Sequence, residues 1–256
     1  MKPYQVALAL ALACTLARAG ELEDGLKAWE NKDFATAHKI FSKLAAAGDP
    51  EAERQLGEMY GFGEGVPEDL GQARRWIEQS RAHGNKEAAT SLALVEQRAA
   101  RKADIARYTT QYDGSDVALA HFKCGNPEIP ESSNTKKKIA EISGKISKWY
   151  ECYGQFAKNL NAQLPAGKAI PQDIAQLMNS AEFDQARMRM DKAYARVGDE
   201  GKREAEQIGV AEGKWLEASK QAARAADEDY KRGIEESANR RVMSLPPPVS
   251  VSSGGK

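Results

Sequence analysis

The sequence predicts an all-α fold, in which a short α-solenoid is followed by a helical bundle or a long helical hairpin. Three observations point to it: a repeat with a period of 36 residues, apolar residues at helical spacing over most of the chain, and no convincing run of alternating β-branched residues. Only 7% of the 256 residues are aromatic while 29% are charged, as expected for helices with one solvated face.

Residues 1–19 have the features of a secretory signal peptide, with cleavage predicted after Ala19. A basic start precedes the apolar run 6–16, and Ala-Arg-Ala forms a small-x-small cleavage site. This run is too short to span a membrane, and no later segment approaches 18 apolar residues, so we expect no membrane span. The predicted location is the periplasm or the medium. The alternative is a lipoprotein acylated at Cys14.

The charge balance gives no reason to expect nucleic acid as a partner. The chain has 37 basic and 37 acidic residues. Removing residues 1–19 takes away Lys2 and Arg18 and leaves 35 against 37, a net charge of −2.

The repeat lies between Asp33 and Leu94. A shift of 36 residues places Asp33 on Asp69, Ala37 on Ala73 and Phe41 on Ile77. The other matching pairs are Ala46 and Ala82, Gly48 and Gly84, Glu51 and Glu87, Ala52 and Ala88, and Leu56 and Leu92. Repeats of this length are typically helix pairs that bury their apolar faces only by stacking on one another.

One repeat unit reads as helix, turn, helix. Asp49 is the predicted N-cap of the first helix, with a proline at its first position. The segment Gly61–Gly65 carries three glycines and predicts a tight connection. Asp69 is expected to cap the return helix, and Gly84 to end it in the left-handed conformation.

These residues resemble the Sel-one-like repeat, a variant of the tetratricopeptide fold. The matching positions are Ala52, Leu56, Gly57, Tyr60, Gly63, Gly65, Val66, Asp69, Ala73, Trp76 and Gly84. The resemblance covers about residues 22–95 and implies a right-handed superhelix of antiparallel helix pairs that serves as an adaptor for protein complexes. The chain departs from the pattern at Ser80, where the family prefers alanine, and the copy beginning at Trp29 lacks the glycine-rich turn.

Variable positions between the consensus residues would form the binding face. The candidate partner-binding residues are Arg54, Arg74, Arg75 and His83, although a solvated face is the simpler interpretation of the same residues. The expected partner is an envelope or secreted protein.

The chain is too long for one repeat array, so we expect a second domain. A capping helix is predicted from about residue 86 to 109, with the basic stretch 97–107 on its solvated side. After residue 110, glycines and prolines interrupt the helical pattern. The predicted domains are a repeat domain at 20–110, a helical domain at 111–241 and a disordered tail at 242–256.

Two cysteines remain after export, and we predict a disulfide between Cys124 and Cys152. A metal site built on His121 and Cys124 is the alternative, but it lacks further ligands at usable spacing.

The segment 134–163 carries an amphipathic stripe, which consists of Ile139, Ile142, Ile146, Trp149, Tyr153, Phe156 and Leu160. Its polar face is rich in lysine, namely Lys136, Lys137, Lys138, Lys145, Lys148 and Lys158. Two anionic neighbours would suit these lysines: an acidic helix of the same domain, or an anionic envelope polymer.

A long helical segment follows a short helix that begins at Pro171. Asn179 and Glu182 form a predicted capping box, and helical periodicity continues to about residue 241. Gly198 and Gly201 indicate a break or hinge.

No catalytic motif is present, and we predict no catalytic residue, no cofactor and no metal site. The sequence therefore favours an exported, non-enzymatic adaptor. The alternatives are a protein that binds or modifies cell-wall glycan, and self-association through the long helices.

Overall fold

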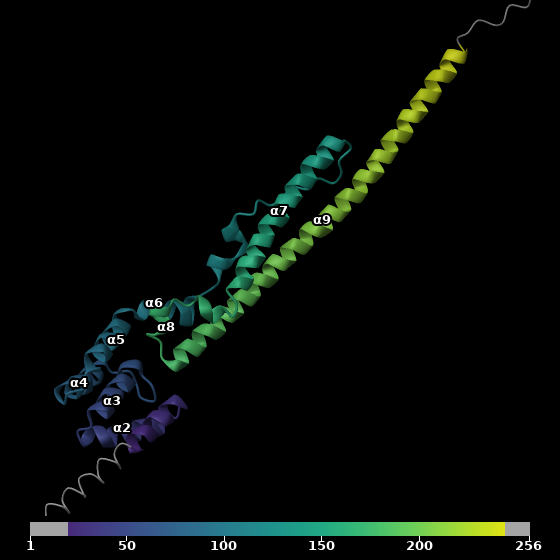
Figure 1. The fold of residues 1–256 in the computed structure, drawn as a ribbon. Helices are drawn as coiled ribbons and strands as arrows, with labels where there is room; N and C mark the ends of the chain where they lie inside the picture. Colours follow the sequence, from purple (N-terminus) through teal and green to yellow (C-terminus); the bar gives the residue numbers. More distant parts are fainter. Residues whose placement is uncertain (1–19, 244–256) are drawn as a thin grey trace, which may run out of the picture. The chain divides into compact units, whose positions relative to one another are not determined.

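The computed structural model describes residues 20–243, and side chains up to residue 237. The predicted signal peptide, Cys14 and the predicted tail from residue 244 onward lie outside these residues. Residues 20–243 form helices joined by turns and loops and contain no strand, which confirms the all-α prediction over that range (Figure 1). The same stretch contains no helix that is both long and apolar enough to cross a membrane.

The chain forms two compact units. The first contains the residues up to 114 together with 163–194, and the second contains 115–162 and the residues from 195 onward. These units do not coincide with the predicted domains at 20–110 and 111–241, because residues 163–194 belong with the first unit.

The first unit begins with a helix at residues 20–30, followed by a series of short helices. Its elements are α2 (Phe34–Ala46), α3 (Pro50–Phe62), α4 (Leu70–Ala82), α5 (Ala88–Ala100), α6 (Lys102–Ala106), a π-helical turn (Arg107–Gln111), a 3-10 turn (Ala166–Ala169), α8 (Gln172–Ala175) and the start of α9 (Ser180–Met243). In sequence order α2 packs on α3, α3 on α4 and α4 on α5, and α3 also contacts α5.

The predicted helix caps are confirmed. The Asp49 carboxylate accepts hydrogen bonds from the amides of Glu51 at 3.0 Å and Ala52 at 2.9 Å, which satisfies two free donors at the start of α3. The Asp69 carboxylate caps α4 in the same way through the amide of Gln72 at 2.9 Å. Gly84 follows α4 with a φ of +91°, the left-handed conformation that favours glycine.

Small residues set the spacing between α3 and α4. A Cβ atom placed on Gly57 would lie 2.5 Å from Cγ1 of Ile77, so only glycine permits this approach. Ala52 and Ala73 are fully buried in the same layers, and Phe41 and Leu56 fill the core between α2 and α3.

The predicted capping helix at 86–109 is wrong in detail. It is divided at Arg101, whose φ of −110° ends α5, and α6 and the π-helical turn follow. The basic stretch 97–107 is also not entirely on the solvated side, because Arg98 is 2% exposed.

The second unit contains α7 (Lys136–Ala162), two 3-10 turns (Ser115–Val117 and Leu119–Phe122) and the part of α9 after residue 194. The amphipathic stripe of α7 supplies its core: Ile146, Trp149, Phe156 and Leu160 are buried, and Val197, Ile208 and Trp215 of α9 are buried in the same unit. The predicted disulfide is present, since Cys124 and Cys152 are bonded with a Cα–Cα distance of 5.6 Å.

The hinge predicted at Gly198 and Gly201 is wrong, because α9 is continuously helical from Ser180 to Met243. Instead, the missing side chains of these glycines leave room for side chains of α7 to pack against α9. A Cβ atom on Gly201 would lie 2.5 Å from Cε1 of Phe156, and one on Gly198 would lie 3.4 Å from Cδ2 of Leu160. The two glycines that predicted a break therefore allow α7 and α9 to pack closely.

Candidate functional site

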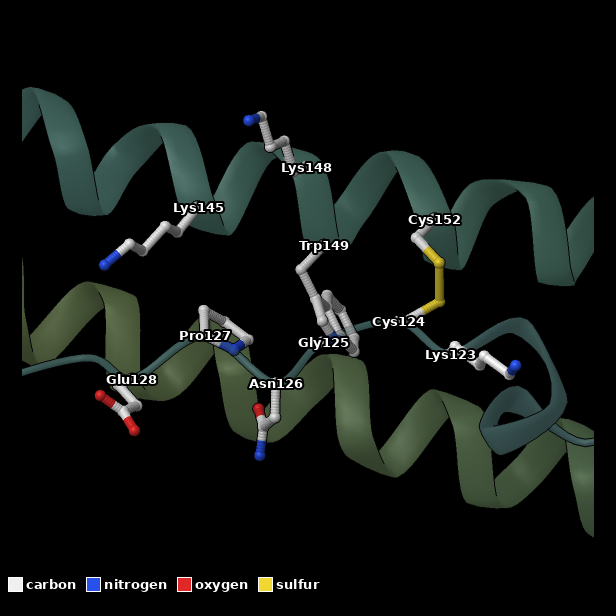
Figure 2. A pocket seen from close by; sticks show the side chains of 10 residues that line it. All are labelled: Lys123, Cys124, Gly125, Asn126, Pro127, Glu128, Lys145, Lys148, Trp149 and Cys152. Atoms are coloured by element: carbon white, nitrogen blue, oxygen red, sulfur yellow. A yellow bond between two sulfur atoms is a disulfide. The ribbon is translucent and has the colours of Figure 1, made fainter.

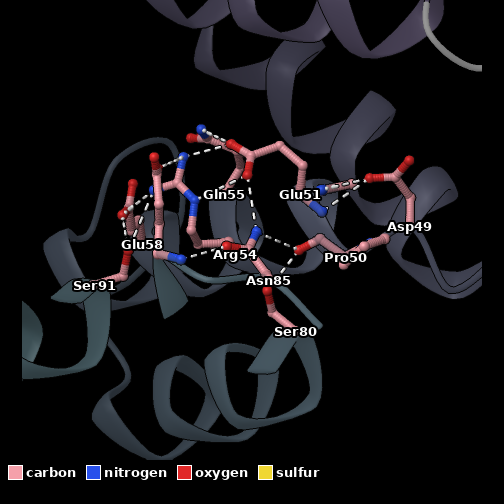
Figure 3. Close-up of polar contacts among 11 residues, drawn as sticks. Asp49, Pro50, Glu51, Arg54, Gln55, Glu58, Ser80, Asn85 and Ser91 are labelled. Atoms are coloured by element: carbon pink, nitrogen blue, oxygen red, sulfur yellow. Dashed lines mark hydrogen bonds and ion pairs between the residues drawn. The ribbon is translucent and has the colours of Figure 1, made fainter. Parts of the chain in front are cut away.

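Arg54, the first predicted partner-binding residue, lies inside a polar network between α3 and α5. Its guanidinium contacts the Glu51 carboxylate, donates to Oε1 of Glu58 at 2.5 Å and donates to Oγ of Ser91 at 3.2 Å (Figure 3). The Ser91 hydroxyl in turn donates to Oε1 of Glu58 at 2.5 Å. The Arg54 side chain is only 12% exposed, so it joins two helices rather than offering a free charge to a partner.

The same network shifts two carboxyl groups in opposite directions. Burial raises the pKa of Glu58, and its hydrogen bonds from Ser91 and Arg54 only partly offset that rise. Burial would also raise the pKa of Glu51, but hydrogen bonds from Arg54, Gln55 and Asn85 outweigh it, so the pKa of Glu51 is lowered. Two positions about two turns apart on α3 thus hold one carboxyl group that resists ionisation and one that favours it.

His83 is also engaged within the protein. Its Nδ1 lies 2.9 Å from Oε2 of Glu53, a carboxylate with no exposed surface, and Gln79 donates to the other oxygen of Glu53 at 2.7 Å. The imidazole side chain is 44% exposed. His83 therefore covers a buried acid of α3 at the end of α4.

Arg74 and Arg75 remain on the outer face of α4. Arg74 donates from Nε to the Glu96 carboxylate of α5 at 3.1 Å, and both side chains are about half exposed, at 49% and 47%. The Arg75 guanidinium lies 5.7 Å from the ring centre of Trp76, which is partly buried. Of the four candidate residues, only this adjacent pair presents charge to solvent without a buried partner.

The residues that match the repeat pattern act as structural residues. Gly63 ends α3 with a φ of +69°, and Gly65 has a φ of +74° and would place a Cβ atom 2.4 Å from Cβ of Phe34. Tyr60, Val66 and Trp76 pack on the core formed by α2 and α3.

Arg98 joins the helices to the start of α9. Its Nη1 donates at 2.6 Å both to the carbonyl of Leu177 and to Oε2 of Glu182, and its Nη2 donates at 3.0 Å to Glu68 and to Oε1 of Glu182. The guanidinium also stacks over Phe62, 5.3 Å from the ring centre. This cluster links the start of α9 to α5 within the first unit.

The glycine-rich turn after α3 is covered by the same segment. Oε1 of Glu64 accepts hydrogen bonds from the amide and the hydroxyl of Ser180 at 3.2 and 3.1 Å, and Oε2 accepts one from the indole of Trp29. The Asn179 side chain donates to the carbonyl of Phe62 at 2.9 Å. This edge of the helical array is therefore occupied by the chain itself.

Sequence reasoning missed Arg98, Glu53 and Glu64, which are all buried. Charged residues of this kind follow no apolar periodicity, and their partners lie up to 116 residues away. One signal was available: Glu182 closes the predicted capping box, where it accepts from the amide of Asn179 at 2.9 Å and its own amide donates to Asn179 at 2.8 Å. A carboxylate fixed in this way is a ready partner for a buried arginine.

Within residues 20–243, no three His, Cys, Asp or Glu side chains gather in a way that could hold a metal ion.

No family profile matches the chain, and no solved structure matches it. The chain is similar to an uncharacterised protein of Neisseria meningitidis serogroup B, with 44% identity over 61 residues. That stretch is 24% of this chain and covers only 13% of the relative.

Proposed function

We propose that this protein is an exported, non-enzymatic adaptor that binds another protein through the helices of its first unit. The array α2–α5 is a Sel-one-like α-solenoid in this proposal, and its outer α4 face is the docking surface. The expected partner is an envelope or secreted protein, because a chain with a signal peptide and a disulfide is suited to the periplasm or the medium.

The observation that carries the proposal is the exposed basic pair Arg74 and Arg75 on α4, where the Arg75 guanidinium lies 5.7 Å from the ring centre of the partly buried Trp76. Arginine and tryptophan are the side chains most often found at the energetic centre of protein interfaces. The ion pair of Arg74 with Glu96 is half exposed and weak enough to be exchanged for a partner's carboxylate. By contrast, Arg54 and His83 are committed to Glu58 and Glu53, so the docking surface is restricted to α4.

The test uses two charge-reversal variants of matched design. Arg74→Glu with Arg75→Glu changes an adjacent basic pair on α4, and Lys202→Glu with Arg203→Glu changes an adjacent, exposed basic pair on α9. Each variant and the wild type carry a C-terminal tag, are crosslinked in cells and are purified for mass spectrometry. Circular dichroism melting of each variant first establishes that the helical fold is retained.

We expect the crosslinking experiment to recover one protein with the wild type and the α9 variant, and to lose that protein with the α4 variant. The purified pair should then bind with a Kd raised at least about tenfold by the α4 change, since several kcal/mol often reside in such anchor residues. Recovery of the same proteins with all three forms would reject α4 as the docking surface.

A further inference from the structure

A groove of about 490 Å³ lies beside the disulfide of the second unit, between α7 and the loop of residues 123–128 (Figure 2). This volume is in the range of small-molecule sites in proteins. Both walls belong to the second unit, and the Cys124–Cys152 bond joins them. The loop is therefore held against the helix before any ligand arrives, which lowers the entropic cost of binding.

Trp149 lines the groove and carries a hydrogen-bond donor without a partner in the described part of the chain. Its indole ring extends from α7 toward the loop, and the residue is only 2% exposed (Figure 2). The Nε1 atom is buried and has no hydrogen-bond partner among the described residues. The buried Trp215 differs, because its Nε1 donates to Ser133 Oγ at 3.0 Å. A buried donor without an acceptor is uncommon and costs free energy, so a ligand that supplies an acceptor would be stabilised there.

Three lysines give the groove a positive potential. Lys123, Lys145 and Lys148 line it against one acid, Glu128, which leaves a formal excess of two positive charges (three minus one). Lys145 forms an ion pair with Glu141 of its own helix at 2.9 Å. Neither Lys123 nor Lys148 forms an ion pair with any described residue.

The sequence offered an acidic helix of the same domain as one neighbour for these lysines, but no ion pair to such a helix is found among the described residues. None of the six lysines on the polar face of α7 forms an ion pair with α9, and the pair between Lys145 and Glu141 lies within α7. Lysines without an ion-pair partner can instead bind an anion from outside the chain.

We propose that this groove binds an oxyanion, a carboxylate or a phosphate ester, carried on a small polar ligand. The Trp149 Nε1–H donates to one oxygen of the anion, Lys123 and Lys148 supply its counter-charge, and the Asn126 amide on the loop contacts the polar remainder. A free sugar acid or sugar phosphate and the same group on a cell-envelope polymer share this chemistry. The site lies in the second unit and does not depend on the adaptor function of the first.

Proton–nitrogen correlation NMR of the indole groups tests the site directly. The chain has four tryptophans, and the Trp149→Phe variant identifies the Trp149 signal by its loss. Full-length mature protein is titrated with glucose 6-phosphate, with glucuronate and with uncharged glucose. The proposal expects both anions to shift the Trp149 indole signal, with a Kd on the order of 1 mM, and expects glucose to leave it unchanged.

Charge reversals on one helix provide the matched control. Lys148→Glu lines the groove, whereas Lys158→Glu makes the same change elsewhere on α7. Lys148→Glu should weaken binding at least about tenfold, and Lys158→Glu less than about threefold, because exposed charges farther away are screened by salt. A double Cys124→Ser, Cys152→Ser variant should also bind more weakly, because its loop is no longer held.

A polygalacturonate oligomer separates the two sources of the anion. Tighter binding per site than glucuronate indicates a polymer, and equal binding indicates a free small anion; both results support the site. An unmoved Trp149 signal with every anion would overturn the proposal. So would equal losses from Lys148→Glu and Lys158→Glu, or stronger binding of a glutamate peptide than of either sugar anion.

Discussion

Arg98 and Glu182 form a two-pronged ion pair across 84 residues of sequence, with Nη1–Oε2 at 2.6 Å and Nη2–Oε1 at 3.0 Å. The same Glu182 carboxylate accepts from the amide of Asn179 and so completes the N-terminal cap of α9. One acidic side chain therefore begins a helix and neutralises a buried cation of another helix. The parallel geometry of two N–H···O bonds makes this a strong contact.

Replacing Arg98 should destabilise the first unit substantially. Arg98→Ala leaves the Glu182 carboxylate without its cation, leaves Glu68 with Lys102 alone, and removes the donor to the Leu177 carbonyl, so we expect a loss of about 3 kcal/mol in the free energy of unfolding. Urea denaturation measures it. Arg101→Ala is the control, because its pairs with Asp104 and Asp173 are exposed to solvent and should contribute much less to stability. Equal losses in the two variants would contradict a special role for Arg98.

Two glycines of α9 should respond in opposite directions to alanine. Gly201→Ala places a methyl group 2.5 Å from Phe156 and should cost about 1–3 kcal/mol through overpacking. Gly213→Ala meets no atom within 4 Å and should gain about 0.5–1 kcal/mol, since alanine is the better helix former. Thermal unfolding followed by circular dichroism measures both. A stabilising Gly201→Ala would show that the two helices can move apart at no cost.

Glu58 and Glu51 should give opposite dependences of stability on pH. The pKa of Glu58 is raised above its ordinary value of 4.5, so its favourable contribution is complete below pH 4.5 and is lost as the pH rises through the folded-state pKa. Glu58→Gln removes that loss, and its stability relative to wild type should increase as the pH rises from 4 to 7.

Glu51→Gln should show the reverse trend. The pKa of Glu51 is lowered, so the stability that its carboxylate contributes is present above pH 4.5 and is lost as the pH falls through the folded-state pKa. The variant should therefore become progressively less stable than wild type as the pH rises from 3 to 6. Urea titrations at several pH values measure both trends, and slopes of the same sign would refute the assignment of the two shifts.

Removing the disulfide should destabilise the second unit. The bond closes a loop with a sequence separation of 28, for which the chain-entropy relation gives about 3–4 kcal/mol. Cys124→Ser with Cys152→Ser should reproduce the effect of reducing the wild type with dithiothreitol, as measured by urea unfolding. A further loss when the double variant is treated with dithiothreitol would point to another cause.

Local signals in the sequence predicted much of the fold. Asp49, Asp69 and Gly84 act at helix ends as their types indicate, because caps depend on a few neighbouring residues. The stripe of α7 and the cysteine pair were predictable for a related reason, since each depends on residue type and spacing rather than on distant partners.

The errors occurred where contacts are distant in the chain. Gly201 was interpreted by its helix propensity, whereas its role depends on the ring of Phe156, 45 residues earlier (201 minus 156). Arg54 was assigned to the binding face because it lies at a variable position between consensus residues, whereas its side chain is bonded to Ser91 and Glu58. No pattern within a single sequence reveals the contact of Gly201 with Phe156 or those of Arg54 with Ser91 and Glu58. The anion groove was missed for the same reason, since the loop at 123–128 and α7 meet only in the folded unit.

The first unit is assembled from two stretches of chain separated by residues 115–162, and this arrangement sets an order on its folding. During synthesis, Arg98 leaves the ribosome 84 residues ahead of Glu182. At rates of about 5–20 residues per second, that delay is on the order of 4 to 17 seconds. Both cysteines are made within this interval. Until then Arg98 lacks two of its partners, the Leu177 carbonyl and the Glu182 carboxylate, so a nascent chain stopped before residue 177 cannot complete the unit.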